Sequence, residues 1–165
     1  MERGKGAGFP GAPLALIFPD KQFLLIDSLK KRIKILGEII EALEMPNVAL
    51  LHTRAEDLAH KEEYREKFDI CVSRAVANLA VLSEYCLPFV KPGGAFISYK
   101  GPGAQEELRK AGIAIKLLGG EAKGIRQVNL EGFDLCHNMI IIKKRRKTPA
   151  KYPRKAGAPA KGPLG

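Results

Sequence analysis

Four glycines crowd a short segment near the start of the chain, and they could hold a nucleotide-type ligand. The segment reads Gly4-Lys5-Gly6-Ala7-Gly8-Phe9-Pro10-Gly11. Glycine tolerates positive φ and lets backbone N–H groups approach a ligand closely, as in loops that hold phosphates and nucleotides. A plain turn would explain the same cluster, and the glycines alone leave both interpretations open. The segment has no Gly-Lys-Ser/Thr ending, which argues against a nucleoside triphosphatase.

An acidic residue, Asp27, strengthens the ligand-binding interpretation. It ends the apolar run Phe23–Ile26 and follows the glycines by about 20 residues, where an open α/β sheet places an acid that accepts hydrogen bonds from two ribose hydroxyls. The alternative is that Asp27 helps to cap a helix beginning at Ser28. The two roles are compatible.

The elements that must position these residues alternate along the chain. Strands are expected at Phe23–Ile26, Val48–Leu51, Ile70–Val72, Ala95–Tyr99, Ile125–Leu130 and Cys136–Ile142. Helices are expected from Ser28 to Leu43, in part of Ala55–Phe68, from Asn78 to Leu87 and over Ala104–Leu118. Such alternation predicts βαβ units and an α/β fold with a mostly parallel sheet. The last two strands have no helix between them, so we expect an antiparallel C-terminal hairpin.

Composition narrows the class of protein. A chain of 165 residues, 45% hydrophobic and 28% charged, can form a globular core and is not globally disordered. No apolar run reaches the roughly 20 residues that span a bilayer, so we expect no membrane partner. Three cysteines without CxxC spacing and three ungrouped histidines predict neither a disulfide framework nor a metal site. A reducing cytoplasm fits best.

The positive charge is concentrated at the C-terminal end. The net charge is +10, yet nine lysines and arginines lie from Lys143 onward with no acid among them. We predict a domain over residues 1–147 and a disordered, Pro/Gly/Ala/Lys-rich tail over residues 148–165. Such a tail can bind nucleic acid through phosphates, and a solubilising role is the alternative. The candidate contacts are Lys100, Lys143, Lys144, Arg145, Arg146, Lys147, Lys151, Arg154 and Lys155.

Five blocks in order carry a resemblance to a known family. They are Gly6–Gly11, Leu25–Arg32, Arg54–Glu56, Ser73–Ala77 and Lys100–Gly101. They resemble the bacterial 16S ribosomal RNA guanine-N7 methyltransferases, also called small-subunit methyltransferase G or glucose-inhibited division protein B. The resemblance implies a Rossmann-like fold, S-adenosylmethionine as methyl donor, and a cytoplasmic, monomeric enzyme that methylates N7 of a guanine in 16S rRNA. Because N7 carries a lone pair and no proton, no catalytic general base is expected.

The resemblance also implies which residues bind the donor. Glycines approach its methionine portion, Phe9 lines that pocket, Ala55 and Glu56 lie beside the adenine, and Arg74 lies near the methyl group. With Asp27 on the ribose, the expected set is Gly4, Gly6, Gly8, Phe9, Asp27, Ala55, Glu56 and Arg74. Each has a structural alternative: Phe9 as ordinary core, Glu56 as a solvated helix-start carboxylate, and Arg74 in an ion pair. Lys100 could be exposed or could contact RNA phosphate.

The start of the sequence departs from the family. The family's first strand precedes the glycine loop, whereas only Met1-Glu2-Arg3 precede Gly4 here. We therefore expect a sheet that lacks its first, central strand, with unpaired edges on the two neighbouring strands and reduced or lost activity. A non-catalytic RNA-binding protein of this lineage is the alternative function. A methyltransferase for a small molecule is a third, weaker one.

Overall fold

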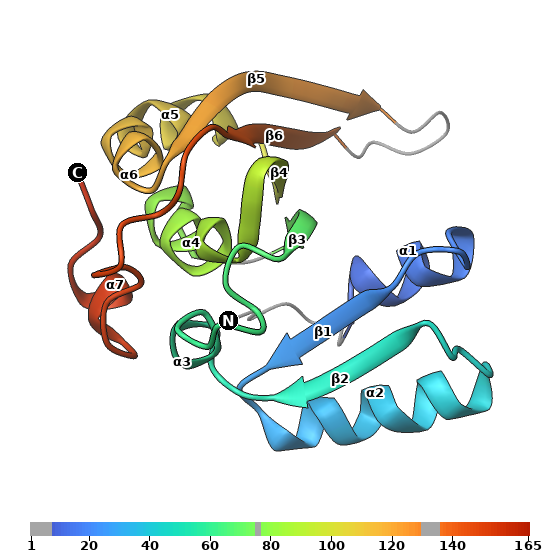
Figure 1. Ribbon diagram of the computed structural model, residues 1–165. Coiled ribbons are helices and arrows are strands. Elements are labelled where there is room, and N and C mark those ends of the chain that lie inside the picture. The colour runs from blue at the N-terminus through green and yellow to red at the C-terminus, as the bar shows by residue number, and fades with distance from the viewer. Residues whose placement is uncertain (1–7, 75–76, 130–135) are drawn as a thin grey trace.

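The computed structural model describes residues 8–74, 77–129 and 136–165 (Figure 1). Its strands are β1 (Phe23–Asp27), β2 (Val48–His52), β3 (Phe68–Ser73), β4 (Val90–Lys100), β5 (Gly120–Asn129) and β6 (Cys136–Lys144). Its helices are α1 (Gly11–Ile17), α2 (Lys30–Ala42), α3 (Ala55–Leu58), α4 (Leu79–Cys86), the 3₁₀ turn η1 (Leu87–Phe89), α5 (Ala104–Lys110), α6 (Gly112–Leu117) and α7 (Ala158–Lys161). Every predicted strand is found, with bounds shifted by a few residues.

The strands form two sheets. β1 and β2 pair in parallel, and the other sheet has the order β3-β4-β6-β5. β3 and β4 are parallel, whereas β6 runs antiparallel to both β4 and β5. The predicted α/β class, with parallel strands and an antiparallel C-terminal hairpin, is thereby confirmed.

β1 and β3 each lie at an edge of their own sheet. In the described part of the chain β1 pairs only with β2, and β3 pairs only with β4. The residues of β1 before Asp27 are only half-buried, and Ile70 of β3 is 57% exposed. Within the described ranges, each of these two strands therefore has one edge without a strand partner. A small apolar cluster bridges the sheets: Ile26 of β1 and Phe68 of β3 both pack against the buried group Leu58, Ala59 and Phe89.

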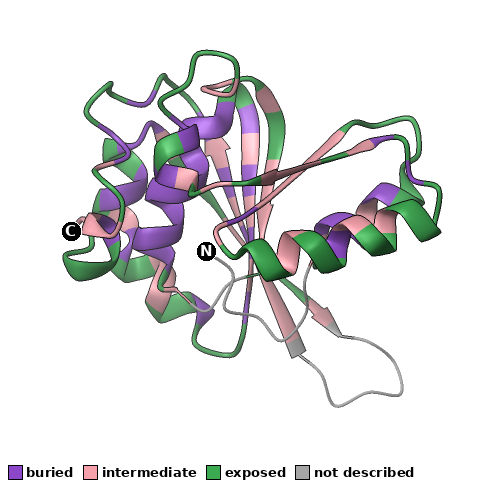
Figure 2. Cartoon of the chain, turned by 90° about the horizontal axis from the view of Figure 1, so that it is seen from below, coloured by how far each residue is buried: buried purple, intermediate pink, exposed green. Residues whose placement is uncertain are grey.

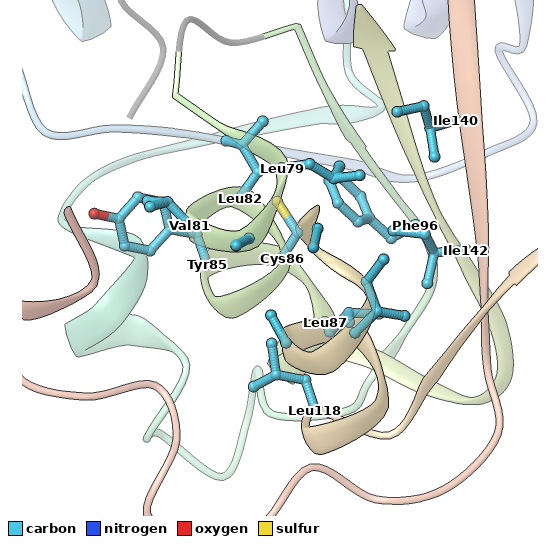
Figure 3. Packing of buried hydrophobic residues seen from close by; sticks show 14 of the residues in the cluster. Leu79, Val81, Leu82, Tyr85, Cys86, Leu87, Phe96, Leu118, Ile140 and Ile142 are labelled. Atoms are coloured by element: carbon cyan, nitrogen blue, oxygen red, sulfur yellow. The ribbon is translucent and has the colours of Figure 1, made fainter. Parts of the chain in front are cut away.

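The main core lies between α4, the α5–α6 pair and one face of the four-stranded sheet (Figure 2). All eight residues of α4 are buried. Phe96 of β4 is fully buried beside Ile142 of β6 and points toward α4 (Figure 3). Alternation along β4 creates this contact, because its buried residues after Gly94 are every second one.

Two helix boundaries differ from expectation. α2 begins at Lys30 rather than Ser28, because Oδ1 of Asp27 accepts a hydrogen bond from the Leu29 N–H (2.8 Å) and leaves Ser28 outside the helix. The single helix expected over Ala104–Leu118 is two helices, α5 and α6, which meet at Ala111 and Gly112. Glycine costs about 1 kcal/mol in a helix interior, so a break there is inexpensive.

The start of α4 offers a direct test of local structure. The helix starts where the sequence predicted, and Asn78 caps it: its Oδ1 accepts a hydrogen bond from the Val81 N–H at 3.0 Å. Asn78→Ala should lower the free energy of unfolding by about 1 kcal/mol in urea titrations, because that N–H loses its acceptor. Asn138→Ala is the control, since its amide donates to Gly101 O in an exposed position. Equal losses in the two variants would contradict the capping role.

The C-terminal segment differs from the expected disordered tail. Residues 148–165 lie against α3 and α4, and Tyr152 is buried in the main core (Figure 1). The guanidinium of Arg65 donates hydrogen bonds to the backbone carbonyls of Thr148, Pro149 and Tyr152. Long-range contacts of this kind override a composition that is typical of disorder. Within the described ranges, no helix is long and apolar enough to cross a bilayer.

Candidate functional site

The carboxyl ends of β1 and β2 come together and bring two predicted site residues to one edge. Asp27 ends β1 opposite His52 of β2. The N–H of Thr53 donates to the backbone oxygen of Asp27 at 3.1 Å, so the loops that follow the two strands are in contact. Two residues further on, α3 begins with Ala55 and Glu56. This edge is where open α/β sheets bind their ligands.

Asp27 is both a cap and a candidate ligand group. Its carboxylate is 8% exposed, with Oδ1 accepting from the Leu29 N–H and Oδ2 paired with Arg32 Nη1 at 3.2 Å. These bonds fix the turn that leads into α2, so Asp27 supports the start of that helix, although the helix begins at Lys30 and not at Ser28. A carboxylate has about four acceptor positions, so these bonds leave room for ribose hydroxyls.

Glu56 is buried rather than a solvated helix-start carboxylate. It is 6% exposed, and its Oε1 accepts a hydrogen bond from the Gly157 N–H at 3.0 Å. The charge of Glu56 also affects Tyr85 of α4. Burial raises the pKa of Tyr85 most, and the negative charges of Glu56 and Glu84 raise it further. Ala55 is partly buried against both apolar clusters. A buried carboxylate at this edge suits an amino group as ligand.

The glycine loop is described only from Gly8 onward, and Gly4 and Gly6 lie outside the described residues. Gly8 has φ +82° and sits so close to Leu36 that a Cβ would collide with that side chain. The backbone conformation therefore favours glycine here, and a larger residue would also have to displace the Leu36 side chain. Phe9 is 47% exposed, so it is not the ordinary core residue of the alternative interpretation.

Arg74 and Lys100 have different environments. Arg74 follows β3 and is exposed. Lys100, at the end of β4, is 7% exposed; its Nζ donates to Ala77 O and pairs with Glu107 Oε2, both at 2.7 Å. The same Glu107 oxygen accepts the Leu79 N–H at 3.0 Å. Lys100 thus ties the segment after β3 to α5, a structural role that neither sequence interpretation anticipated.

Two further candidate RNA contacts also have internal partners. Lys144 is fully buried, and its Nζ donates to Leu87 O and to the Thr148 hydroxyl. Arg154 forms an ion pair with Glu84, which is itself fully buried. The others lie nearer the surface: Lys143 is half-buried, and Arg145, Arg146, Lys147, Lys151 and Lys155 are exposed. Arg145 pairs with Glu121, and the Lys151 ammonium lies over the Tyr152 ring.

Comparison with known proteins assigns the family. Residues 2–136 match the sequence profile of the family described as rRNA small subunit methyltransferase G. The chain belongs to that family. A relative of the same name from Clostridium tetani is 54% identical over 164 residues, covering 99% of this chain and 69% of the relative. One from Acetivibrio thermocellus is 51% identical and covers 99% of this chain and 67% of its own length. The predicted resemblance and the predicted enzyme class, a methyltransferase, are confirmed.

Solved structures agree on the fold of this methyltransferase G family member. The 16S rRNA (adenine(1408)-N(1))-methyltransferase from Catenulisporales acidiphilia gives a TM-score of 0.68 at 14% identity, covering 87% of this chain and 83% of that one. The SAM-dependent O-methyltransferase from Thermotoga maritima gives 0.59 at 13% identity, covering 88% and 59%. At such identities the likeness shows the fold alone, a Rossmann-like methyltransferase fold. No group of three potential metal ligands occurs among the residues described.

Proposed function

We propose that the chain transfers a methyl group from S-adenosylmethionine to N7 of a guanine in 16S rRNA. The observation that carries the proposal is the family match over residues 2–136. Two buried carboxylates at the carboxyl edge of β1 and β2 support it, because Asp27 and Glu56 each keep an acceptor position free for a nucleoside.

The residues at this edge would bind and orient the donor. Asp27 would accept hydrogen bonds from the ribose hydroxyls, and Glu56 would accept one from the adenine amino group, with Ala55 beside the ring. Gly8 and Phe9 would line the methionine portion, with Gly4 and Gly6 preceding them. Arg74 would lie near the reacting groups. Acidic groups also suit a cationic sulfonium ligand, since their charges attract it.

Methylation of N7 requires that the reacting atoms be aligned and requires no proton transfer. When bound, S-adenosylmethionine supplies a methyl carbon whose bond to sulfur breaks, with the electron pair staying on sulfur, as N7 of guanine forms its bond to that carbon. N7 has a lone pair and no proton, so the carboxylates need not act as bases. The work of the chain's residues is to hold the reacting atoms in line and to exclude water. The guanine must be unstacked to reach them, and exposed cations such as Lys147 and Lys155 would hold RNA phosphates.

Methyl transfer can be tested directly. The chain is incubated with tritiated S-adenosylmethionine and small ribosomal subunits that lack N7-methylguanine, and the expected result is label in 16S rRNA. Treatment with borohydride and aniline should then cleave the strand at the labelled guanine, because N7-methylguanine is sensitive to these reagents. The Clostridium tetani relative, of which this chain spans 69%, is the positive control. Label with the relative and none with this chain would overturn the proposal.

The alternative function has its own signature. If the chain binds 16S rRNA in a salt-dependent manner and calorimetry detects no uptake of S-adenosylmethionine, it is a non-catalytic RNA-binding protein of this family. A cytoplasmic location and a monomeric state stay predictions.

A further inference from the structure

The C-terminal segment is fixed to α4 by an ion pair inside the protein. Glu84 is fully buried in α4, whose other residues are mostly apolar. Its carboxylate accepts hydrogen bonds from Arg154 Nε at 2.9 Å, from Nη2 at 2.7 Å and from the backbone N–H of Arg154 at 2.8 Å. Pairing with Glu84 raises the pKa of Arg154. A buried carboxylate saturated in this way holds the backbone of residue 154, as well as its side chain, in one place.

Two side chains from the region after α3 hold the same segment from the other side. His60 Nε2 lies 2.8 Å from the backbone oxygen of Pro153. Arg65 Nη1 donates to Tyr152 O at 2.9 Å, and its Nη2 donates to Thr148 O at 2.8 Å. Residues 148–153 are therefore tied to the region after α3, and Arg154 ties the segment to α4.

Three residues beyond Arg154, the segment reaches the candidate donor site. The Gly157 N–H donates to Oε1 of Glu56 at 3.0 Å, across 101 residues of sequence. Gly157 has φ +82°, a conformation that favours glycine, although a Cβ there would meet no neighbour within 4 Å. A pocket of about 330 Å³ lies beside this contact, between α3 and the segment, and Glu56 and Arg154 both line it.

We propose that Arg154 and Gly157 are positioning residues for Glu56, and that they hold its carboxylate so that Oε2 faces the amino group of the donor's adenine. The inference rests on the proposed function. Its physical basis is rotamer freedom: a glutamate side chain loses about 1.5–2 kcal/mol of entropy when it is fixed. Because the Gly157 N–H already holds the Glu56 side chain in the folded chain, this entropy is lost on folding and not on ligand binding. The same N–H occupies Oε1 and leaves Oε2 able to accept a hydrogen bond.

The proposal predicts a loss of base discrimination. The chain should bind S-adenosylhomocysteine more tightly than S-inosylhomocysteine, because the latter has a carbonyl oxygen where adenine has its amino group. Arg154→Gln, and a chain ending at Ala156, should each reduce the ratio of the two dissociation constants about tenfold in isothermal titration calorimetry. The shorter chain keeps Arg154 on Glu84, so it remains informative if Arg154→Gln does not fold.

A matched control and three outcomes decide the matter. Lys161→Gln removes an exposed cation of α7 and should leave the ratio unchanged within twofold. If the unaltered chain discriminates between the two compounds and both variants still do so fully, the positioning role is wrong while the proposed function stands. If the unaltered chain binds neither compound nor S-adenosylmethionine, the proposed function falls and this inference falls with it. Loss of discrimination in the variants, with circular dichroism unchanged, supports the proposal.

Discussion

Asp27→Asn should weaken binding of S-adenosylmethionine by about 10- to 100-fold, measured by calorimetry. A hydrogen bond to a charged group contributes about 1.5–3 kcal/mol, and each 1.4 kcal/mol is tenfold in affinity. Asparagine keeps one oxygen, which can still accept from the Leu29 N–H and hold the start of α2. It loses the negative charge and places an NH2 group, which donates and cannot accept, where the second carboxylate oxygen was. The expected loss therefore falls on ligand binding more than on folding.

The chain offers a matched control in Asp69. This carboxylate is exposed at the start of β3, where a hydrogen bond from Lys91 lowers its pKa. Asp69→Asn makes the same chemical change away from the carboxyl edge, and it should leave the dissociation constant unchanged within twofold. If Asp27→Asn also left affinity unchanged while melting temperature fell, Asp27 would be a helix cap and nothing more.

The positions of the strands could be predicted from the sequence, because each strand is marked by residues within it or next to it. β4 was predicted from the short run Ala95–Tyr99 that follows the turn residues Pro92-Gly93-Gly94, and a short apolar run bounded by turn residues can be recognised without knowing its partner strand. The start of α4 after Asn78 and the antiparallel pairing of β5 with β6 involve segments that are close in sequence, and both were predicted correctly. The split between α5 and α6 was missed, because an apolar stripe that continues past Gly112 outweighed one unfavourable glycine.

The environment of the charged residues could not be predicted in the same way. From sequence alone a lysine is expected at the surface unless an acidic partner can be identified. Lys100 is paired with Glu107, which lies on a different element, so the sequence did not reveal the pair. Arg154 pairs with Glu84, 70 residues earlier. One signal was available: Glu84 interrupts the apolar run Leu79–Phe89, and an acid in such a position demands a cationic partner when it is buried.

The same reasoning gives a large effect at Lys144. Its ammonium is fully buried, lies 3.2 Å from Glu66 Oε1, and donates to Leu87 O and the Thr148 hydroxyl, each at 2.6 Å. Lys144→Met should lower the free energy of unfolding by about 3 kcal/mol, because removing one partner of a buried pair leaves the other charge uncompensated. Urea titration at neutral pH measures the loss. Lys143→Met, one residue earlier and half-buried, removes a single contact to Gly93 O and should cost within about 0.5 kcal/mol.

The effect of Lys144 should also depend on pH, and its sign follows from burial. Burial lowers the pKa of Lys144 in the folded chain, against the opposing influence of Glu66. Between that lowered pKa and the ordinary value of about 10.5, the unfolded chain binds more protons than the folded one, so stability from this group rises with pH. The stability advantage of the unaltered chain over Lys144→Met should therefore widen as pH approaches 10.5. A constant difference over that range would mean that the pKa of Lys144 is not lowered by folding, and a shrinking difference that it is raised; either result would contradict the effect of burial.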